Sequence, residues 1–210
     1  MIVIIDSGVA NTGSIANMLK RIGAGCKVSS RKEDILSAAR LILPGVGSFD
    51  AGMGSLAAAS LIDPIRQRVL EGQVPLLGVC LGMQLLSRRS EEGSLPGLGL
   101  IAADTVKWRF DPKTTGLKIP HMGWNTVNPE NDSPLFKSAL EISRYYFVHS
   151  YHVVCDDAAD VAATVHHGYE AVAAVARGNV MGVQFHPEKS HSFGMKLLED
   201  YCNWIPAESG

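Results

Sequence analysis

Short apolar runs alternate with helical patterns through the first half of the chain, and this alternation restricts the possible fold more than any other feature. In residues 11–22, for example, the apolar positions 15, 18, 19 and 22 fall at i, i+3, i+4 and i+7, on one face of a helix. Strands that alternate with helices are typical of a parallel, doubly wound sheet. The predicted strands are Ile2–Ile5, Cys26–Ser29, 40–43 and 74–79, and the predicted helices are 11–22, 35–39, 51–60, 61–71 and 81–87.

The second half of the chain has a different pattern. Short runs rich in Val and aromatic residues are separated by Gly, Asp and His-Gly, which predicts antiparallel strands. Since no linker, repeat or low-complexity tract interrupts the chain, we expect a single domain over residues 1–210. The predicted fold class is α/β, a mostly parallel doubly wound sheet with an antiparallel C-terminal portion. The predicted antiparallel strands are 145–148, 151–154, 161–165, 171–175 and 180–185, followed by a final helix.

The composition excludes several classes of protein. The chain has 210 residues, of which 46% are hydrophobic and 19% charged, so it is too apolar to be disordered. Its formal net charge is −2 and it has no basic run, which argues against nucleic acid as the main partner. No apolar stretch approaches the roughly 20 residues of a membrane helix. The N-terminal run ends at Asp6 without a basic flank, so we expect a first strand there rather than a signal peptide.

The four cysteines, Cys26, Cys80, Cys155 and Cys202, lie far apart and form no C-x-x-C pair. This spacing fits neither a disulfide scaffold nor a zinc site, and it favours a reducing, cytoplasmic location. We therefore expect each cysteine to be either a small core residue or a reactive thiol.

Cys80 has the surroundings of a nucleophile. The sequence Gly78-Val79-Cys80-Leu81-Gly82 has the G-x-nucleophile-x-G form between a predicted strand and a predicted helix. The flanking glycines permit a sharp turn, and the start of a helix favours a thiolate. The alternative is a buried structural cysteine in an apolar run. Strand, glycines and helix together favour the nucleophile.

A nucleophilic cysteine needs a base, and His186-Pro187-Glu188 offers the best candidate among the seven histidines. Pro187 biases His186 toward an extended backbone, on which residues two apart point to the same side. Glu188 is therefore expected to reach His186 Nδ1 while Nε2 faces the thiol. By contrast, His166-His167 before Gly168 is predicted to be a solvated turn, and His191 an exposed residue at the start of a helix.

The glycine-rich sequence Pro44-Gly45-Val46-Gly47 follows the third predicted strand. Its backbone N–H groups suit an oxyanion, and such a loop also suits a phosphate. The loop lacks the Lys-Ser/Thr ending of a P-loop. With Cys80 at the end of a neighbouring strand, the oxyanion interpretation is preferred.

These motifs resemble those of the class I, triad-type glutamine amidotransferases. The resemblance is carried by Gly-Val-Cys-Leu-Gly-Met-Gln at 78–84, Pro-Gly-Val-Gly at 44–47 and His-Pro-Glu at 186–188. The stretches 120–125, 146–151 and 185–190 further resemble the glutaminase subunits of imidazole glycerol phosphate synthase, a family of histidine biosynthesis. Relatives that serve anthranilate, aminodeoxychorismate or carbamoyl phosphate synthesis share the motif around Cys80 but not the His-Met-Gly-Trp-Asn stretch at 121–125.

The resemblance implies hydrolysis of L-glutamine without a metal or cofactor. Cys80 would attack the side-chain carbonyl, and His186, oriented by Glu188, would move the protons. The oxyanion would be held by backbone groups of Gly45, Val46, Gly47 and Leu81, and glutamine would be bound by Gln84, Glu92, His149, Ser150 and Tyr151. The Ser-Glu-Glu turn that contains Glu92 is also a common solvated surface feature, and Glu91 is adjacent.

The resemblance also implies a partner, a cyclase subunit with a (β/α)₈ barrel that receives the ammonia in a heterodimer. Met122, Trp124 and Lys189 would lie at that interface. Trp124 is predicted on a loop between two strand-like segments, since Gly123 and Asn125 are turn residues. Two alternatives remain: a glutaminase subunit of another amidotransferase, and a non-catalytic regulatory subunit with the same fold. The intact set of Cys80, His186 and Glu188 favours an enzyme.

Overall fold

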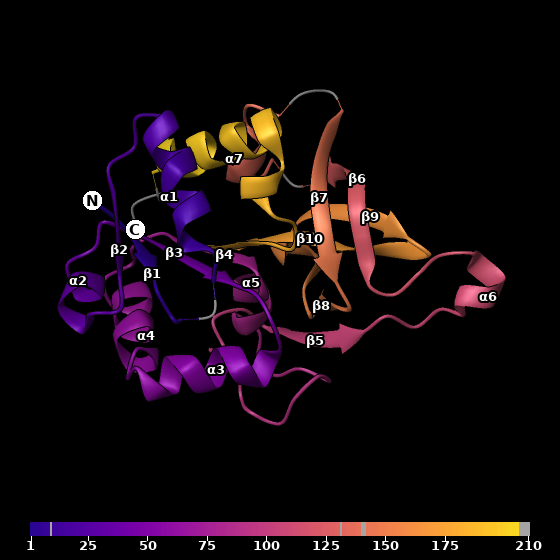
Figure 1. Ribbon diagram of the computed structural model, residues 1–210, viewed down its shortest axis with the longest axis horizontal. Coiled ribbons are helices and arrows are strands. Elements are labelled where there is room, and N and C mark those ends of the chain that lie inside the picture. Colours follow the sequence, from indigo (N-terminus) through magenta and orange to yellow (C-terminus); the bar gives the residue numbers. More distant parts are fainter. Residues whose placement is uncertain (9, 131, 140–141, 206–210) are drawn as a thin grey trace.

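The computed structural model describes residues 1–8, 10–130, 132–139 and 142–205, and its centre is a nine-stranded sheet (Figure 1). The strands of this sheet are β1 (Ile2–Ile5), β2 (Cys26–Ser29), β3 (Arg40–Gly45), β4 (Leu76–Cys80), β6 (His121–Pro129), β7 (Ser143–His149), β9 (Val161–His167), β10 (Tyr169–Arg177) and β11 (Val180–Val183). They lie in the order β2-β1-β3-β4-β11-β10-β9-β6-β7. A separate two-stranded sheet pairs β5 (Ala103–Lys107) with β8 (Tyr151–Cys155).

The sheet has a parallel half and an antiparallel half, as the sequence predicts. Strands β2, β1, β3, β4 and β11 pair in parallel, and β11, β10, β9, β6 and β7 pair in antiparallel fashion. The predicted fold class is therefore confirmed. The prediction for β11 is incomplete: this strand runs antiparallel to β10, as predicted, and also parallel to β4, so it belongs to both halves.

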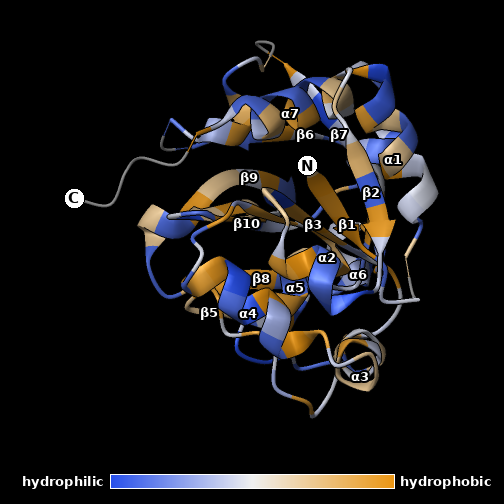
Figure 2. Ribbon diagram, turned by 90° about the vertical axis from the view of Figure 1, so that its left-hand side faces the viewer, coloured by the Kyte–Doolittle hydropathy of each residue, from blue (hydrophilic) through white to orange (hydrophobic). Residues whose placement is uncertain are grey.

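Helices cover both faces of the parallel half (Figure 2). One face packs against α1 (Thr12–Arg21) and α7 (His191–Asn203), and the other packs against α2 (Lys32–Leu36), α3 (Phe49–Ala58), α4 (Ile62–Leu70) and α5 (Leu81–Leu85). Alternate residues of β1 point into the two layers: Ile2 and Ile4 lie in the core with α1 and α7, and Val3 and Ile5 in the other core. Burial on both faces explains why this strand is apolar throughout.

The remaining elements connect these layers. The short helix α6 (Pro112–Thr115) lies on the excursion between β5 and β6 that extends to the right in Figure 1. Three 3₁₀ turns follow in the second half, η1 (Pro134–Phe136), η2 (Ala158–Asp160) and η3 (Pro187–Lys189). None of the described helices is long and apolar enough to span a membrane.

The parallel strands bring the predicted motifs together. Gly45 at the end of β3 is the Cα partner of Cys80 at the end of β4, and Val183 of β11 is the partner of Val79. Ligands of such sheets bind at the carboxyl ends of the strands. The glycine-rich loop, the cysteine and the segment that leads to His186 therefore share one edge of the sheet.

Candidate active site

Cys80 occupies a strained turn between β4 and α5. Its φ is 54° and its ψ is −110°, a backbone conformation that residues with a side chain rarely adopt. This is the geometry of a nucleophile elbow, which presents the middle side chain at the end of a strand. The side chain is 6% exposed.

The flanking glycines serve a purpose other than the one the sequence suggests. Neither Gly78 nor Gly82 has a positive φ, so the unusual backbone conformation belongs to Cys80 itself. A Cβ on Gly82 would lie 1.8 Å from the carbonyl oxygen of Leu43, and one on Gly78 would lie 2.7 Å from the carbonyl group of Gly82. The glycines allow helix α5 to pack directly on the backbone of β3 and β4.

His186 follows β11 and forms a buried pair with Glu188. Its backbone is extended, as Pro187 predicts, and Nδ1 lies 2.7 Å from Glu188 Oε1. The other ring nitrogen, Nε2, is buried and makes no hydrogen bond of ordinary geometry within the described part of the chain. Burial lowers the pKa of His186, but interactions with Cys80 and then Glu188 outweigh burial and raise the pKa to about 9. The predicted contact between His186 Nδ1 and Glu188 is present, and His186 lines the same cavity as Cys80.

The backbone of His186 is fixed by a residue that sequence reasoning missed. The N–H of His186 donates to the carbonyl of Tyr146 at 2.9 Å, and the hydroxyl of Ser190 donates to the carbonyl of His186 at 2.6 Å. Ser190 Oγ also accepts from the N–H of Tyr146 at 3.0 Å, and Ser190 is fully buried. A serine at the start of a helix gives no signal of this role in the sequence.

The glycine-rich loop lies beside the elbow. Gly45 packs closely, since a Cβ there would lie 3.0 Å from Leu81 Cβ. Gly47 has φ +97°, which favours glycine, while Val46 is 44% exposed. Leu81 is the first residue of α5, so its N–H has no carbonyl partner within the helix. The loop and the elbow are therefore adjacent, as predicted.

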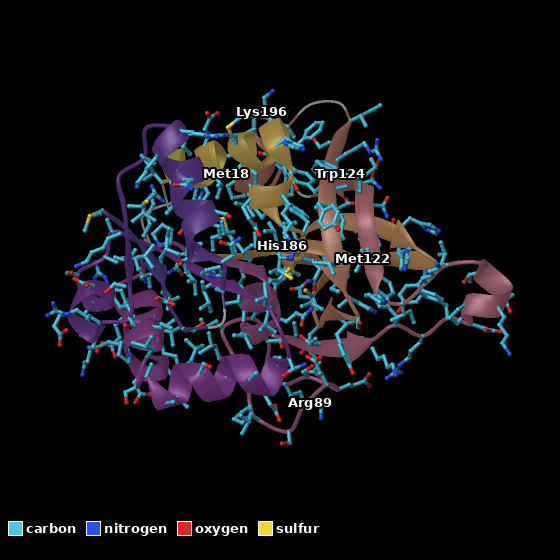
Figure 3. All side chains as sticks on the ribbon, viewed as in Figure 1. Met18, Arg89, Met122, Trp124, His186 and Lys196 are labelled. Atoms are coloured by element: carbon cyan, nitrogen blue, oxygen red, sulfur yellow. The ribbon has the colours of Figure 1, made fainter. Side chains whose placement is uncertain are left out.

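A cavity of about 290 Å³ opens in front of the thiol. Figure 3 shows His186 near the middle of the molecule, between the two halves of the sheet. Ten of the predicted site residues line the cavity, namely Val46, Gly47, Cys80, Leu81, Gln84, Glu92, His149, Ser150, Tyr151 and His186. Sequence reasoning missed Pro120 and Val148, which line it too.

Glu92 is an ordered part of the cavity wall. Its Oε2 accepts a hydrogen bond from the N–H of Phe49, at the start of α3, at 2.8 Å. The same loop is held by Asp50, whose carboxylate accepts from the N–H groups of Ser94 and Leu95. These bonds lower the pKa of Asp50. The alternative of a merely solvated turn is therefore wrong for Glu92.

Two buried glutamine side chains connect the cavity wall to the thiol. Gln84 Nε2 donates to the carbonyl of Tyr151 at 3.0 Å and to Gln184 Oε1 at 2.9 Å. Gln184 Nε2 in turn lies 3.9 Å from Cys80 Sγ. Gln184 is fully buried and was missed by sequence reasoning, because a lone glutamine at the end of a strand carries no motif.

The other three cysteines lie outside the cavity. Burial is the largest cause of a raised pKa in each of them: it brings the pKa of Cys155 to about 12 and that of Cys202 to about 11, and it raises that of Cys26. These thiols stay protonated near neutral pH. Within the described ranges, no group of three or more His, Cys, Asp or Glu side chains has the arrangement of a metal site.

The predicted interface residues lie on an exposed face next to the cavity. Met122 is 61% exposed and Trp124 is 40% exposed. The prediction of a loop is wrong for Trp124, which lies within β6 opposite Tyr146 of β7. Its ring stacks on that of His191, with 5.5 Å between centroids. Lys189 Nζ lies 5.6 Å from the centroid of the Tyr146 ring.

The predicted solvated turn at His166-His167 is also partly wrong. The chain does turn at Gly168, between β9 and β10, and His166 is exposed. His167, however, is buried, and its Nε2 donates to the carbonyl of Lys118 at 2.9 Å. It packs among other aromatic and histidine rings beneath β6.

Known proteins are similar to this chain over almost its entire length. The family model of glutamine amidotransferase class-I matches residues 3–203. Imidazole glycerol phosphate synthase subunit HisH 2 of Pseudomonas aeruginosa is 50% identical over 206 residues, 98% of this chain and 100% of the relative. The protein of the same name from Methanococcus maripaludis is 50% identical over 201 residues, 96% of this chain and 98% of the relative.

Solved structures support the fold. The structure of PurLQS from Thermotoga maritima has a TM-score of 0.72 at 20% identity and covers 96% of this chain and 97% of that one. A structure described as glutamine amidotransferase has a TM-score of 0.71 at 21% identity, with 96% and 100% covered. The match to the family model and the identity to the HisH subunits show that the chain belongs to the class-I glutamine amidotransferases, in the family of HisH subunits of imidazole glycerol phosphate synthase.

Proposed function

We propose that this chain hydrolyses L-glutamine to glutamate and ammonia, and that it delivers the ammonia to the cyclase subunit of imidazole glycerol phosphate synthase. The observation that carries the proposal is the arrangement of Cys80 on a strained elbow in the same cavity as His186, whose ring is paired with Glu188. A regulatory subunit has no use for this arrangement. The names of the relatives supply the pathway.

The first step is formation of a thioester. The thiolate of Cys80 attacks the side-chain carbonyl carbon of glutamine, and the carbonyl oxygen becomes an oxyanion. We infer that N–H groups near Gly47 and that of Leu81 hold this oxyanion, because Gly47 and Leu81 line the cavity together with Cys80. Because the His186 pKa is about 9, its imidazole holds a proton at neutral pH and donates it to the departing nitrogen. The C–N bond breaks, and ammonia leaves.

The second step is hydrolysis of the thioester. His186, now neutral, accepts a proton from water while the water oxygen attacks the acyl carbon. The C–S bond breaks and the Cys80 thiolate is released, and the new carboxylic acid gives its proton to water and leaves as glutamate. Glu188 holds the ring through Nδ1 in both steps, so Nε2 stays directed at the reacting atoms. Glu188 is thus a positioning residue for His186.

The cavity wall offers groups for both ends of the amino acid. The Glu92 carboxylate suits the α-ammonium, and hydroxyl and N–H donors of Ser150 and Tyr151 suit the α-carboxylate. Gln84 also lines the cavity, and its Nε2 already donates to Tyr151 and Gln184. Through these hydrogen bonds it holds the Tyr151 backbone in the cavity wall.

The exposed face of β6 and β7 is the proposed docking site of the cyclase, a (β/α)₈ barrel. Met122 on this face is the direct cross-strand partner of Val148, which lines the cavity. A barrel that covers Met122 and Trp124 would therefore lie next to the place where ammonia forms. Lys189 projects at the same face, close to His186 in sequence, and suits an acidic residue of the barrel.

The test is a glutamine hydrolysis assay on the chain alone and in complex with a candidate cyclase subunit and its nucleotide ligand. The proposal predicts glutamate release that the complex with ligand increases, together with cyclase product made from glutamine. Absence of glutamate release under all conditions contradicts the activity. Glutamate release without cyclase product from any imidazole glycerol phosphate synthase barrel points to another amidotransferase.

A further inference from the structure

A hydrogen-bonded chain runs from the inner side of β6 to the glutamine cavity. Asn125 Nδ2 lies 3.1 Å from His121 Nε2, and His121 Nδ1 lies 2.9 Å from His149 Nε2. His149 Nδ1 lies 2.8 Å from the carbonyl oxygen of Tyr151. His121 and His149 are both buried, and His149 and Tyr151 line the cavity.

The groups at the two ends of this series of hydrogen bonds determine which atom is the donor and which is the acceptor in each bond. The carbonyl of Tyr151 only accepts, so His149 carries its proton on Nδ1 and accepts at Nε2. His121 must then donate from Nδ1, and its Nε2 accepts from the amide nitrogen of Asn125. That amide also donates to the carbonyl of His166 at 2.9 Å, which fixes its orientation. One assignment of protons therefore gives every hydrogen bond in this series a donor and an acceptor.

Both imidazoles must be neutral for this assignment. A proton added to His149 would place its Nε2–H against the Nδ1–H of His121. Burial, and then the nearby His167, lowers the pKa of His121 to about 3, and burial lowers that of His149 well below its usual value. The rings facing the pair are those of Trp108, Phe147, His152 and His167.

This series of hydrogen bonds ends on a carbonyl that Gln84 also holds. Tyr151 O accepts from His149 Nδ1 and from Gln84 Nε2, and Gln84 continues to Gln184 beside the Cys80 thiol. The Ser150–Tyr151 segment of the cavity wall is thus clamped between a histidine pair and a glutamine pair. We expect a change in either support to move this segment of the wall.

We propose that His121 is a positioning residue for glutamine, acting through His149 on the Ser150–Tyr151 wall of the cavity. This inference rests on the proposed glutaminase function. It assigns a role to a histidine that lies outside the cavity, on the strand whose opposite side carries Met122 and Trp124. The effect falls on binding of the substrate rather than on the chemistry at Cys80.

Two substitutions separate the hydrogen bond from the packing. His121→Phe keeps a flat ring stacked between Phe147 and His167, at centroid distances of 4.6 and 4.1 Å, but removes the donor to His149. His121→Asn loses the ring but keeps an N–H near the position of Nδ1. Tyr169→Phe is the matched control. It removes the hydroxyl partner of His152 in the same aromatic cluster, and it leaves the hydrogen bonds from Asn125 to Tyr151 in place.

Kinetics of the complex give the first readout. We expect His121→Phe to raise the KM for glutamine about tenfold, since a buried acceptor loses its donor, with a much smaller change in kcat. His121→Asn should recover most of the affinity, and Tyr169→Phe should keep the KM of the parent. An unchanged KM in His121→Phe, or equal losses in all three variants, overturns the proposal.

Nitrogen NMR of the histidine rings gives a second readout that does not depend on turnover. His121 and His149 should both carry the proton on Nδ1 near neutral pH, and His149 should change its signal in His121→Phe but not in Tyr169→Phe. A proton on Nε2 of either ring overturns the proposal. If the parent protein hydrolyses no glutamine, the proposed function fails instead, and the NMR result shows whether the chain of hydrogen bonds exists without it.

Discussion

His186 Nδ1 lies 2.7 Å from Glu188 Oε1, and both side chains are at least 95% buried. The intervening proline keeps His186 extended, which places the two side chains on the same side of the backbone. One ring nitrogen is therefore occupied, and the other remains for Cys80. The proposed base is therefore oriented by a residue only two positions away in the sequence.

Removal of the base should cost more than removal of its orienting partner. We expect His186→Asn to lower glutamine turnover by at least about 10³-fold, and Glu188→Gln to retain partial activity, since an orienting residue contributes less than the base it orients. Steady-state glutamate release by the complex measures both. Equal inactivity of the two variants, with an unfolded Glu188→Gln protein in circular dichroism, would make Glu188 a structural residue.

The pH dependence of glutamine hydrolysis should report the raised pKa of His186. Because the protonated ring donates to the departing ammonia, kcat/KM should hold up to pH of about 9 and fall tenfold per unit above it. Glu188 raises this pKa, so Glu188→Gln should move the fall to lower pH. Initial rates across the alkaline range decide the matter, and a fall centred near the ordinary histidine value in the parent enzyme contradicts the ion-pair account.

Glycine at position 82 should be indispensable for folding. A Cβ there would lie 1.8 Å from the carbonyl oxygen of Leu43, a backbone atom in a buried strand that has no room to move. We expect Gly82→Ala to lower the free energy of unfolding by more than about 3 kcal/mol. Gly54→Ala is the control, because a Cβ at this helical position meets nothing within 4 Å, and alanine there should be neutral or stabilising. Urea unfolding compares the two.

Trp124 should contribute to assembly with the cyclase more than to the fold. The residue is 40% exposed and its ring stacks on that of His191, so Trp124→Ala should change the Tm of the isolated chain little. Loss of an aromatic anchor should weaken binding of the partner by about 2 kcal/mol or more. Calorimetric titration measures the affinity, and Leu70→Ala, another exposed apolar residue on α4, is the control. A large drop in Tm with unchanged affinity would refute the docking role.

Features that depend on neighbouring residues could be predicted from the sequence. The elbow around Cys80 and the His186–Glu188 pair are set by short-range chain geometry, and the alternation of apolar runs and helices determines the parallel half of the sheet. The role of the two glycines at the elbow is an exception. The sequence predicts that Gly78 and Gly82 permit a sharp turn, whereas in the structure they allow close packing against backbone atoms.

Features that depend on pairing between distant segments could not be predicted from the sequence. Gly123 and Asn125 have low strand propensity, yet the ladder with β7 places them in a strand, so Trp124 lies on a sheet rather than a loop. Gln184 and Ser190 acquire their roles only when β11 aligns with β4 and β7 approaches His186. Burial of His167 arises in the same way, from rings contributed by distant segments.

Selective labelling should single out Cys80 among the thiols. Burial raises the pKa values of Cys26, Cys155 and Cys202, which keeps them protonated and poorly nucleophilic near neutral pH. A glutamine analogue that carries an alkylating group in place of the amide should therefore modify Cys80 alone, as read by peptide mass spectrometry. Prior incubation with excess glutamine should slow the reaction.

The most direct test of the thioester mechanism is the nitrogen source used by a complex that contains Cys80→Ala. The thioester mechanism predicts no glutamate release and no cyclase product from glutamine, while synthesis from added ammonium continues through the intact partner. Persistence of ammonium-dependent synthesis shows that the complex is folded and assembled. Glutamate release by Cys80→Ala at a rate near that of the parent would contradict the account, because no other thiol lines the described cavity.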